Sequence, residues 1–264
     1  MTRIIACSNI KGGEGKSTIS RHLALYADAY KLRTLAIDLD PQGDLSLSLH
    51  PGPAGVESNS SQIFSSDFDP AAAQLVKVSE YLDLLPSSDD LDDIGEQDDR
   101  VSLVKAGRSA IRKLSLPYDV VIIDTPTNAP VCYKTGMAAA HATVSPLQLD
   151  TYGMRGAEKF MRTSLQVKSA FNPTLKHLGF VVNRFNSRSR SHQQMLIELQ
   201  NSGVEVFPTI LRERVAVQDA LDRQMAVWSG PRGSVNRDAA REFRAMCAAV
   251  FKAAGIDTSP RAVA

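Results

Sequence analysis

The sequence has little cysteine and no long apolar run. Only three cysteines occur, Cys7, Cys132 and Cys247, and no two of them form a Cys-x-x-Cys pair. An odd number of widely spread cysteines argues against a disulfide framework or a structural zinc site. No stretch approaches the roughly 18 uncharged apolar residues of a membrane span, and no apolar export segment follows Met1. We therefore expect a cytoplasmic protein with no membrane partner.

The chain also lacks a large excess of charge, because its formal net charge is +1. The distribution is uneven, however: from Lys176 onward 13 lysines and arginines face 8 acidic residues. We expect an anionic partner to bind this basic part. Much of the negative charge lies between Asp89 and Asp99, a run that lacks the glycine and final glutamate of a calcium loop and is expected to be a solvated connection.

Size and patterning predict one α/β domain over residues 1–264, with a disordered tail from about residue 256. Short β-rich runs alternate with longer stretches that favour helix, which predicts βα crossovers and a mostly parallel, twisted sheet flanked by helices. Ligands bind such sheets beyond the carboxyl ends of the strands. The expected strands are Arg3 to Cys7, Thr34 to Leu39, Tyr81 to Leu85, Val120 to Asp124, Ala142 to Leu147, Gly179 to Asn183 and Glu205 to Phe207.

A glycine-rich segment, Lys-Gly-Gly-Glu-Gly-Lys-Ser-Thr, occupies residues 11–18 directly after the first expected strand. Glycines let backbone N–H groups approach phosphate oxygens, and a helix beginning near Ser17 would add its positive end. Lys16 would supply a cation for the terminal phosphates, and Ser17 a hydroxyl for Mg²⁺. The ordinary phosphate-loop pattern fails, because its first glycine would fall at Ile10. A second lysine, Lys11, stands near that position instead and suggests a shared site.

Three segments together resemble the deviant Walker A, A′ and B motifs of the ParA/MinD ATPases. They are KGGEGKST at 11–18, LAIDLDPQGDLSLSL at 35–49 and YDVVIIDTP at 118–126, and the resemblance extends from Thr2 to about Gly255. DLDPQG is typical of the ParA branch. The later segments LQLDTYGMRGAEKF, GFVVNRF and FPTILRERVAVQDALDRQMAVW are similar to plasmid partition ATPases of the IncC type. This resemblance implies a deviant P-loop NTPase fold, ATP and Mg²⁺ as cofactors, and slow ATP hydrolysis.

Three carboxylates are candidates for the metal and water chemistry. Asp124 ends an apolar strand, where a charged side chain needs a ligand or partner. Asp38 and Asp40 lie two residues apart on an extended segment and so point to one face, although a simple acidic turn before Pro41 would place them there too. The resemblance implies that Ser17 and Asp124 bind Mg²⁺, that Asp38 supports it, and that Asp40 positions the attacking water.

The resemblance assigns further roles by position. Lys11 matches a signature lysine that crosses a dimer interface to the neighbour's phosphates, as an arginine finger supplied in trans would. The implied catalytic set is Lys11, Lys16 and Asp40. The implied ATP-binding set is Lys11, Gly12, Gly13, Glu14, Gly15, Lys16, Ser17, Thr18, Asn183 and Pro208, in which Asn183 could also be an ordinary residue at a strand end. Glu14 departs from the family, because a carboxylate that pointed inward would repel the triphosphate.

Arginines cluster in the basic part, and six are candidates for DNA contact: Arg212, Arg214, Arg232, Arg237, Arg241 and Arg244. The last three recur every three or four residues, which places them on one helix face. No aromatic residues alternate with them, so phosphate contact with duplex DNA fits better than base readout. A basic helix face can also be merely solvated; the resemblance favours DNA binding. The first expected strand begins near the start of the sequence, so we expect no preceding helix-turn-helix domain and no sequence-specific autorepression.

The resulting hypothesis is a nucleoid-associated DNA partition ATPase that dimerises on ATP and binds DNA non-specifically. A ParB-like centromere-binding protein would stimulate hydrolysis and release. Two alternatives remain. One is a positioning ATPase for a protein cargo, such as a chemotaxis cluster or a carboxysome. The other is a MinD-like membrane ATPase, for which the apolar stripe Phe243, Met246, Cys247, Val250 and Phe251 would be the membrane face, although a core face explains it more simply.

Overall fold

A computed structural model describes residues 1–50, 52, 58–94, 99–229 and 234–259 of the chain. Within these residues, seven strands form one sheet in the order β3-β4-β2-β5-β1-β6-β7. Every neighbouring pair is parallel except β3 and β4, which are antiparallel at one edge. The strands are β1 (Arg3–Cys7), β2 (Thr34–Asp38), β3 (Val76–Lys77), β4 (Leu82–Leu85), β5 (Val120–Asp124), β6 (Ala142–Leu147) and β7 (Lys176–Val182).

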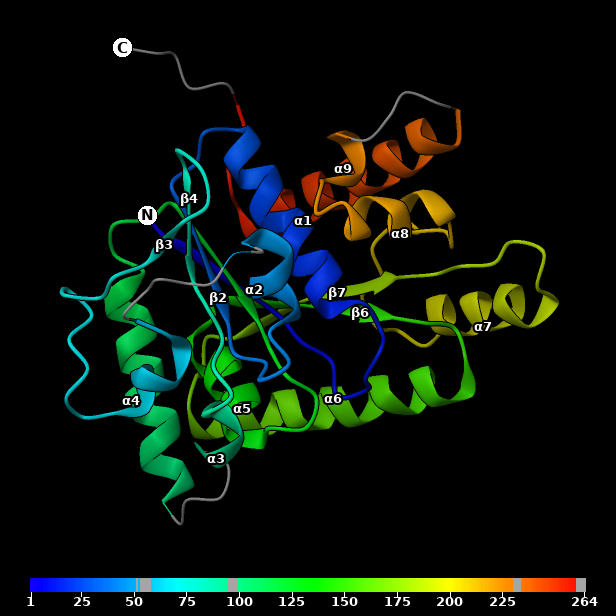
Figure 1. The fold of residues 1–264 in the computed structure, drawn as a ribbon. Coiled ribbons are helices and arrows are strands. Elements are labelled where there is room, and N and C mark those ends of the chain that lie inside the picture. Colours follow the sequence, from blue (N-terminus) through cyan, green and yellow to red (C-terminus); the bar gives the residue numbers. More distant parts are fainter. Residues whose placement is uncertain (51, 53–57, 95–98, 230–233, 260–264) are drawn as a thin grey trace.

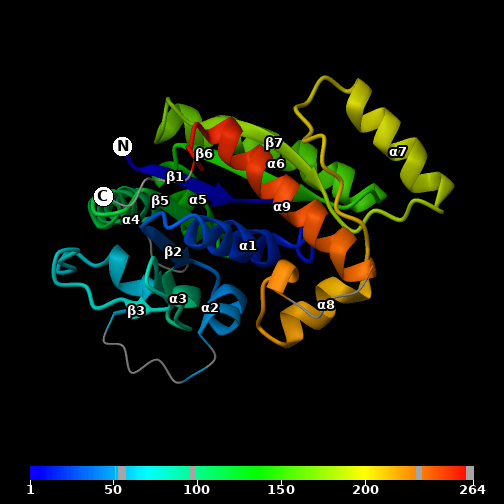
Figure 2. The same cartoon turned by 90° about the horizontal axis from the view of Figure 1, so that it is seen from above.

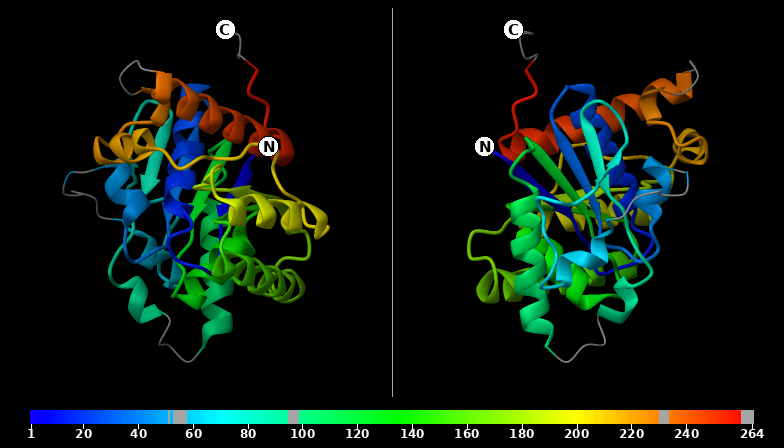
Figure 3. Two further views of the ribbon diagram at one scale, coloured as in Figure 1. Left: turned by 90° about the vertical axis from the view of Figure 1, so that its right-hand side faces the viewer. Right: turned by 60° about the vertical axis from the view of Figure 1, so that its left-hand side comes forward.

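Helices cover both faces of the sheet (Figures 1 and 2). In chain order they are α1 (Lys16–Ala29), α2 (Asp44–Leu49), α3 (Leu91–Ile94), α4 (Arg100–Leu114), α5 (Pro130–Ala139), α6 (Thr151–Ala170), α7 (Arg190–Asn201), α8 (Val215–Asp222) and α9 (Ser234–Ala254), with 3-10 turns η1 (Ser60–Phe64) and η2 (Val227–Ser229). Helices α4, α5 and α6 lie on one face, and α1 and α9 on the other. Figure 3 shows both layers edge-on.

Alternating residues of the central strands supply the two cores. In β1, Ile4 and Ala6 belong to the cluster beneath α4, α5 and α6, whereas Ile5 and Cys7 belong to the cluster beneath α1 and α9. A strand covered on both faces must be apolar at every position. This explains why the expected strands were continuous apolar runs, and the predicted parallel α/β fold is confirmed.

Two of the expected details were wrong. Residues 205–207 form no strand and contribute only an isolated bridge between Val206 and Phe180. The short edge strand β3 was not expected, because two residues give no period that a sequence could reveal.

The apolar stripe of α9 faces the protein core. Phe243, Met246, Cys247, Val250 and Phe251 are all 2% exposed or less, which agrees with a core face. No helix in the described part of the chain is both long and apolar enough to cross a membrane. All three cysteines are buried and free, as expected.

Candidate functional site

The site forms where β1, β5 and β2 end side by side. Register places Cys7 beside Asp124, and Asp124 beside Asp38, at the carboxyl edge of the sheet. From β1 the chain turns through the glycine-rich loop into α1. Gly15 has a φ of 96°, and a Cβ there would lie 2.4 Å from Asn183 Nδ2. Both the left-handed backbone and the close approach therefore require glycine at this position.

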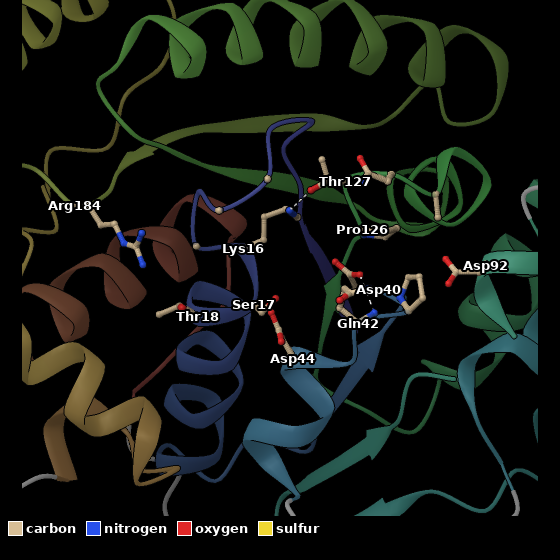
Figure 4. A pocket seen from close by; sticks show the side chains of 16 residues that line it. Lys16, Ser17, Thr18, Asp40, Gln42, Asp44, Asp92, Pro126, Thr127 and Arg184 are labelled. Atoms are coloured by element: carbon tan, nitrogen blue, oxygen red, sulfur yellow. Dashed lines mark hydrogen bonds between the residues drawn. The ribbon is translucent and has the colours of Figure 1, made fainter. Parts of the chain in front are cut away.

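A cavity of about 750 Å³ opens at this edge (Figure 4). The loop glycines Gly12, Gly13 and Gly15 line it together with Lys16, Ser17 and Thr18. Lys16 donates a hydrogen bond from Nζ to Thr127 Oγ1 at 2.8 Å, so its ammonium is held over the cavity floor. The helix dipole of α1 points its positive end into the same space. This arrangement suits a chain of phosphates.

Asp40 also lines this cavity, beyond the end of β2. Its Oδ1 accepts a hydrogen bond from the Gln42 backbone N–H at 3.1 Å. Burial raises the pKa of Asp40 against the lowering effect of that hydrogen bond and of Lys16. A carboxylate with a raised pKa at the phosphate end is suited to accept a proton from, or to orient, an attacking water.

Two further carboxylates are fully buried at the strand ends. Asp124 accepts a hydrogen bond on Oδ1 from Ser20 Oγ at 2.8 Å, whereas its buried Oδ2 has no hydrogen-bond partner among the described residues. Burial raises the pKa of Asp124 and of Asp38, and for Asp38 the negative charge of Asp124 raises it further. An orphaned oxygen beside a second buried carboxylate is a position that a cation would stabilise.

The two carboxylates differ in how they could serve a metal. Both oxygens of Asp38 are used: Oδ1 accepts from the Asp40 N–H at 3.1 Å, and Oδ2 accepts from the N–H and hydroxyl of Ser46 at 2.8 and 2.7 Å. Asp38 therefore holds the segment that carries Asp40. Only Asp124 retains an open oxygen. The described residues contain no cluster of three or more His, Cys, Asp or Glu side chains that could cage a metal, which is compatible with Mg²⁺ because this ion usually keeps waters and phosphate ligands.

A second cavity of about 390 Å³ adjoins the first and shares Gly15, Thr18 and Arg184 with it. Its wall includes apolar side chains of α8 and α9: Val215, Val217, Leu221 and Phe243. Asn183 lines this cavity, and its Nδ2 donates to the Glu14 carbonyl at 2.7 Å. Pro208 is exposed and is not among the described residues that line either cavity. The structure thus brings Asn183 to the loop but leaves Pro208 outside.

Lys11 and Glu14 lie on the other side of the loop from the cavity. Lys11 Nζ donates to both oxygens of Asp150, at 2.9 and 2.8 Å, and lies 2.7 Å from Glu14 Oε1. Glu14 is 0% exposed, and its Oε2 accepts from the Gln148 backbone N–H. The carboxylate that could have repelled phosphates therefore points away from them.

The arginines expected to contact DNA fall into two groups. Arg212 and Arg214 share one carboxylate, that of Glu242 of α9, at 2.7 and 2.8 Å, so it compensates only part of their two positive charges. Arg237, Arg241 and Arg244 are exposed on α9; Arg241 pairs with Asp238 at 2.9 Å, and Arg244 lies 5.8 Å above the Trp228 ring. Arg232 lies outside the described residues.

Several residues of the site were not expected from the sequence. Asp44, Asp92, Thr127 and Arg184 all line the larger cavity. Asp92 comes from the acidic run that we expected to be a solvated connection. Asp44 and Thr127 follow β2 and β5 by only a few residues, whereas a longer connection brings Asp92 of α3 to the sheet edge. The sequence contains one indication for Arg184, because it directly follows Asn183 just beyond the end of β7.

A glycine-rich loop leads from the central parallel strand β1 into α1, with Lys16 and buried aspartates beside it. This arrangement defines a P-loop NTPase fold. The AAA_31 family model, an AAA domain, matches residues 2–177 of the chain. The chain belongs to this ParA/MinD-type ATPase family, so the resemblance inferred from its motifs is confirmed.

Three relatives show where the chain lies within the family. The chromosome partitioning protein ParA of Myxococcus xanthus is 30% identical over 224 residues, which cover 82% of this chain and 77% of the relative. The chromosome-partitioning ATPase Soj of Thermus thermophilus is 31% identical over 219 residues, covering 83% and 84%. Protein IncC of Escherichia coli is 30% identical over 246 residues, covering 91% and 66%.

Solved structures share the fold over nearly the whole chain. Cobyrinic acid a,c-diamide synthase from Mycobacterium smegmatis, solved with an ATP analog and magnesium, has a TM-score of 0.78 and 29% identity, and the match covers 96% of this chain and 95% of that one. An ATP complex of a Cyanothece McdA variant has a TM-score of 0.80 at 22% identity, covering 100% and 99%. The second similarity shows the fold alone.

Proposed function

We propose that this chain is a DNA partition ATPase. It binds ATP and Mg²⁺, dimerises, binds duplex DNA without sequence preference, and is released from the nucleoid when a ParB-like protein stimulates hydrolysis. The observation that carries the proposal is the pair of adjoining cavities, which share Gly15, Thr18 and Arg184. Their sizes and linings fit a triphosphate joined to a nucleoside, in a chain about 30% identical to partition proteins.

The residues of the larger cavity divide the work of hydrolysis. Lys16 and the N–H groups of the glycine loop hold the phosphates and offset their charge. Ser17 and the open Oδ2 of Asp124 would hold Mg²⁺, which, when bound, neutralises charge on the phosphate oxygens. Asp40 orients the water for in-line attack. Asp38 acts indirectly, because its carboxylate accepts from the Asp40 N–H and so positions Asp40.

The second cavity would receive the nucleoside. Val215, Val217 and Leu221 give it an apolar wall suited to a flat base. Asn183 donates a hydrogen bond from its amide to the Glu14 carbonyl, which fixes the loop. Its side-chain oxygen accepts from the Arg184 N–H at 3.0 Å. Asn183 holds the phosphate loop against β7 and also lines this cavity, where the adenine contact that the family resemblance implies stays a prediction.

Dimerisation would gather enough charge for DNA. One subunit offers only Arg237, Arg241 and Arg244 as exposed arginines of the candidate set on α9, and two subunits double that number. If a dimer neutralised about six phosphates, log K would fall with log salt at a slope of roughly −5. Binding should therefore require ATP and weaken steeply with salt.

The test is a titration of random and plasmid-derived duplexes at several salt concentrations, with ATP, with ADP and without nucleotide. We expect DNA binding with ATP, and none with ADP or without nucleotide. The affinity should be equal for all duplexes, and Lys16→Ala should not bind DNA. Strong preference for one sequence, or equal affinity without nucleotide, would overturn the proposal. The gene beside the one for this chain bears on the cargo: a ParB-like DNA-binding protein supports partition, whereas a small cargo-associated protein supports positioning of a protein assembly.

A further inference from the structure

Glu14 belongs to the glycine-rich loop, but the proposed function gives it no role. Its side chain is fully buried, although Gly12 and Gly13 beside it are exposed. It is absent from the residues that line the larger cavity and reaches the segment after β6, where Oε2 accepts from the Gln148 N–H. Glu14 therefore acts on something other than the phosphates.

The group that Glu14 meets is the ammonium of Lys11. Lys11 Nζ lies 2.7 Å from Glu14 Oε1 as an ion pair, while its hydrogen bonds go to the two oxygens of Asp150. In the described part of the chain, Glu14 Oε1 has no polar partner other than this ammonium. The charge of Lys11 is thus what compensates this buried oxygen, and one ammonium serves two carboxylates.

The two carboxylates would respond differently if Lys11 moved away. The Asp150 side chain is 44% exposed and also accepts from the Gly153 N–H at the start of α6, at 2.6 Å. Water could solvate it at once. The Glu14 side chain is 0% exposed and would keep only its hydrogen bond from the Gln148 N–H. It would have to hold a buried charge or take up a proton, and either costs more than exposing Asp150 to water.

We propose that Glu14 is a positioning residue that holds Lys11 within its own subunit and so raises the ATP concentration needed for dimerisation. The inference rests on the proposed function, and it takes the role of Lys11 at the partner's nucleotide from the family resemblance. Lys11 cannot neutralise its own Glu14 and reach the phosphates of a second copy at the same time. Each dimer therefore leaves two buried carboxylates without their cation, and the bound nucleotides must offset this loss.

The test uses Glu14→Gln, which removes the charge but keeps the length and an acceptor for the Gln148 N–H. Light scattering with Mg²⁺ and a non-hydrolysable ATP analogue should show half-maximal dimerisation at about tenfold lower analogue concentration, the size expected for loss of one charge-assisted contact. Analogue affinity of the dilute monomer should not change. A merely structural role would weaken binding and dimerisation together. Glu14→Ala should shift dimerisation in the same direction.

The matched control is Asp150→Asn, which removes the exposed carboxylate while its amide can still cap α6. Its effect should be smaller, and an equal gain in both variants would contradict the part played by burial. Lys11→Ala separates the two proposals. If it fails to dimerise while Glu14→Gln behaves as the unaltered protein, the role of Glu14 is wrong and that of Lys11 stands. If Lys11→Ala dimerises normally, Lys11 does not cross the interface and both roles fall.

Discussion

At the scale of single residues, the site separates phosphate binding from water positioning. Lys16 is 6% exposed and donates a hydrogen bond to Thr127. Asp40 lies on the segment beyond β2, where its carboxylate accepts from the Gln42 N–H and its backbone is held by Asp38 and Ser87. Lys16 begins α1, whereas Asp40 follows β2. Each can therefore be removed without displacing the other.

The first prediction uses this separation. Lys16→Ala should abolish ATP-dependent dimerisation, because the cation that holds the terminal phosphates is lost. Asp40→Ala should still dimerise with ATP and Mg²⁺, and the dimer should accumulate because hydrolysis stops. Light scattering with ATP and a phosphate-release assay measure both effects. A monomeric Asp40→Ala protein would remove the proposed role of that residue.

Arg184 gives a second prediction at this scale. It has a φ of 52°, a conformation that costs a residue with a Cβ about 1 kcal/mol or more and that is concentrated at functional sites. It lines both cavities, and Figure 4 shows its guanidinium near Thr18. Arg184→Ala should weaken ATP binding to the monomer about tenfold, as loss of a charged contact does. The exposed Arg188, four residues on and outside both cavities, is the matched control. Calorimetric titration giving equal affinities for the two variants would exclude this role.

At the scale of elements, α9 has two distinct surfaces. Its apolar stripe packs on the sheet, and Glu242 beside that stripe ties Arg212 and Arg214 to the helix. The periodicity of the α9 arginines predicted the exposed face of that helix. It did not predict the pairing of Arg212 with Glu242, because these two residues lie 30 positions apart and no local pattern links them. The exposed candidate arginines of α9 are Arg237, Arg241 and Arg244, and DNA contact by any of the six candidates stays a prediction.

The prediction for α9 is a change in salt dependence. Arg237→Ala and Arg241→Ala should each make the slope of log K for DNA against log salt less negative by about 0.9 per lost phosphate contact, counted for each subunit of the dimer. All duplexes should weaken alike, and ATP binding should stay unchanged. Arg162→Ala is a matched control: it is 77% exposed and pairs with Glu158 on its own helix, much as Arg241, at 75%, pairs with Asp238. Equal slopes for Arg162→Ala and Arg241→Ala would contradict a DNA surface on α9.

Elements built on local signals were predicted well, and those that depend on distant contacts were not. The apolar runs of β1, β5 and β6 gave their bounds directly, and the glycine loop placed the start of α1. Residues 205–207 have strand-like composition but bridge to β7 at one point only. The cavity wall from α8 could not be seen in advance, since it is set by how the chain returns along β7. Roles that depend on a second subunit remain predictions.

At the scale of the whole molecule, buried histidines join segments far apart in the chain. His22 of α1 is 0% exposed and packs against Phe243 of α9, with ring centroids 4.5 Å apart. Its Nε2 accepts a hydrogen bond from the Val227 N–H at 3.2 Å, and Nδ1 lies 2.7 Å from the Thr18 carbonyl. These partners require a proton on Nδ1 and none on Nε2. The layer of α1, η2 and α9 is therefore assembled around a neutral imidazole.

Each buried neutral histidine should consequently contribute to loss of stability in acid. Burial lowers the pKa of His22 from 6.5 to about 3, and burial also lowers the pKa of His141 and His177 to about 4. Between these values and pH 6.5 each of these histidines binds more protons in the unfolded chain than in the folded one, so its contribution to stability is present above pH 6.5 and is lost as the pH falls. The raised pKa values of buried Asp38 and Asp124 act in the opposite direction. The free energy of unfolding should drop by roughly 1.4 kcal/mol per pH unit for each such histidine.

Denaturant titrations of the nucleotide-free protein between pH 7 and about pH 4.5 measure this slope. The control variant is His22→Gln, whose amide can still accept from Val227 and donate to Thr18. Its slope of unfolding free energy against pH should be smaller by the contribution of one histidine. A slope equal to that of the unaltered protein would show that His22 is already protonated in the fold.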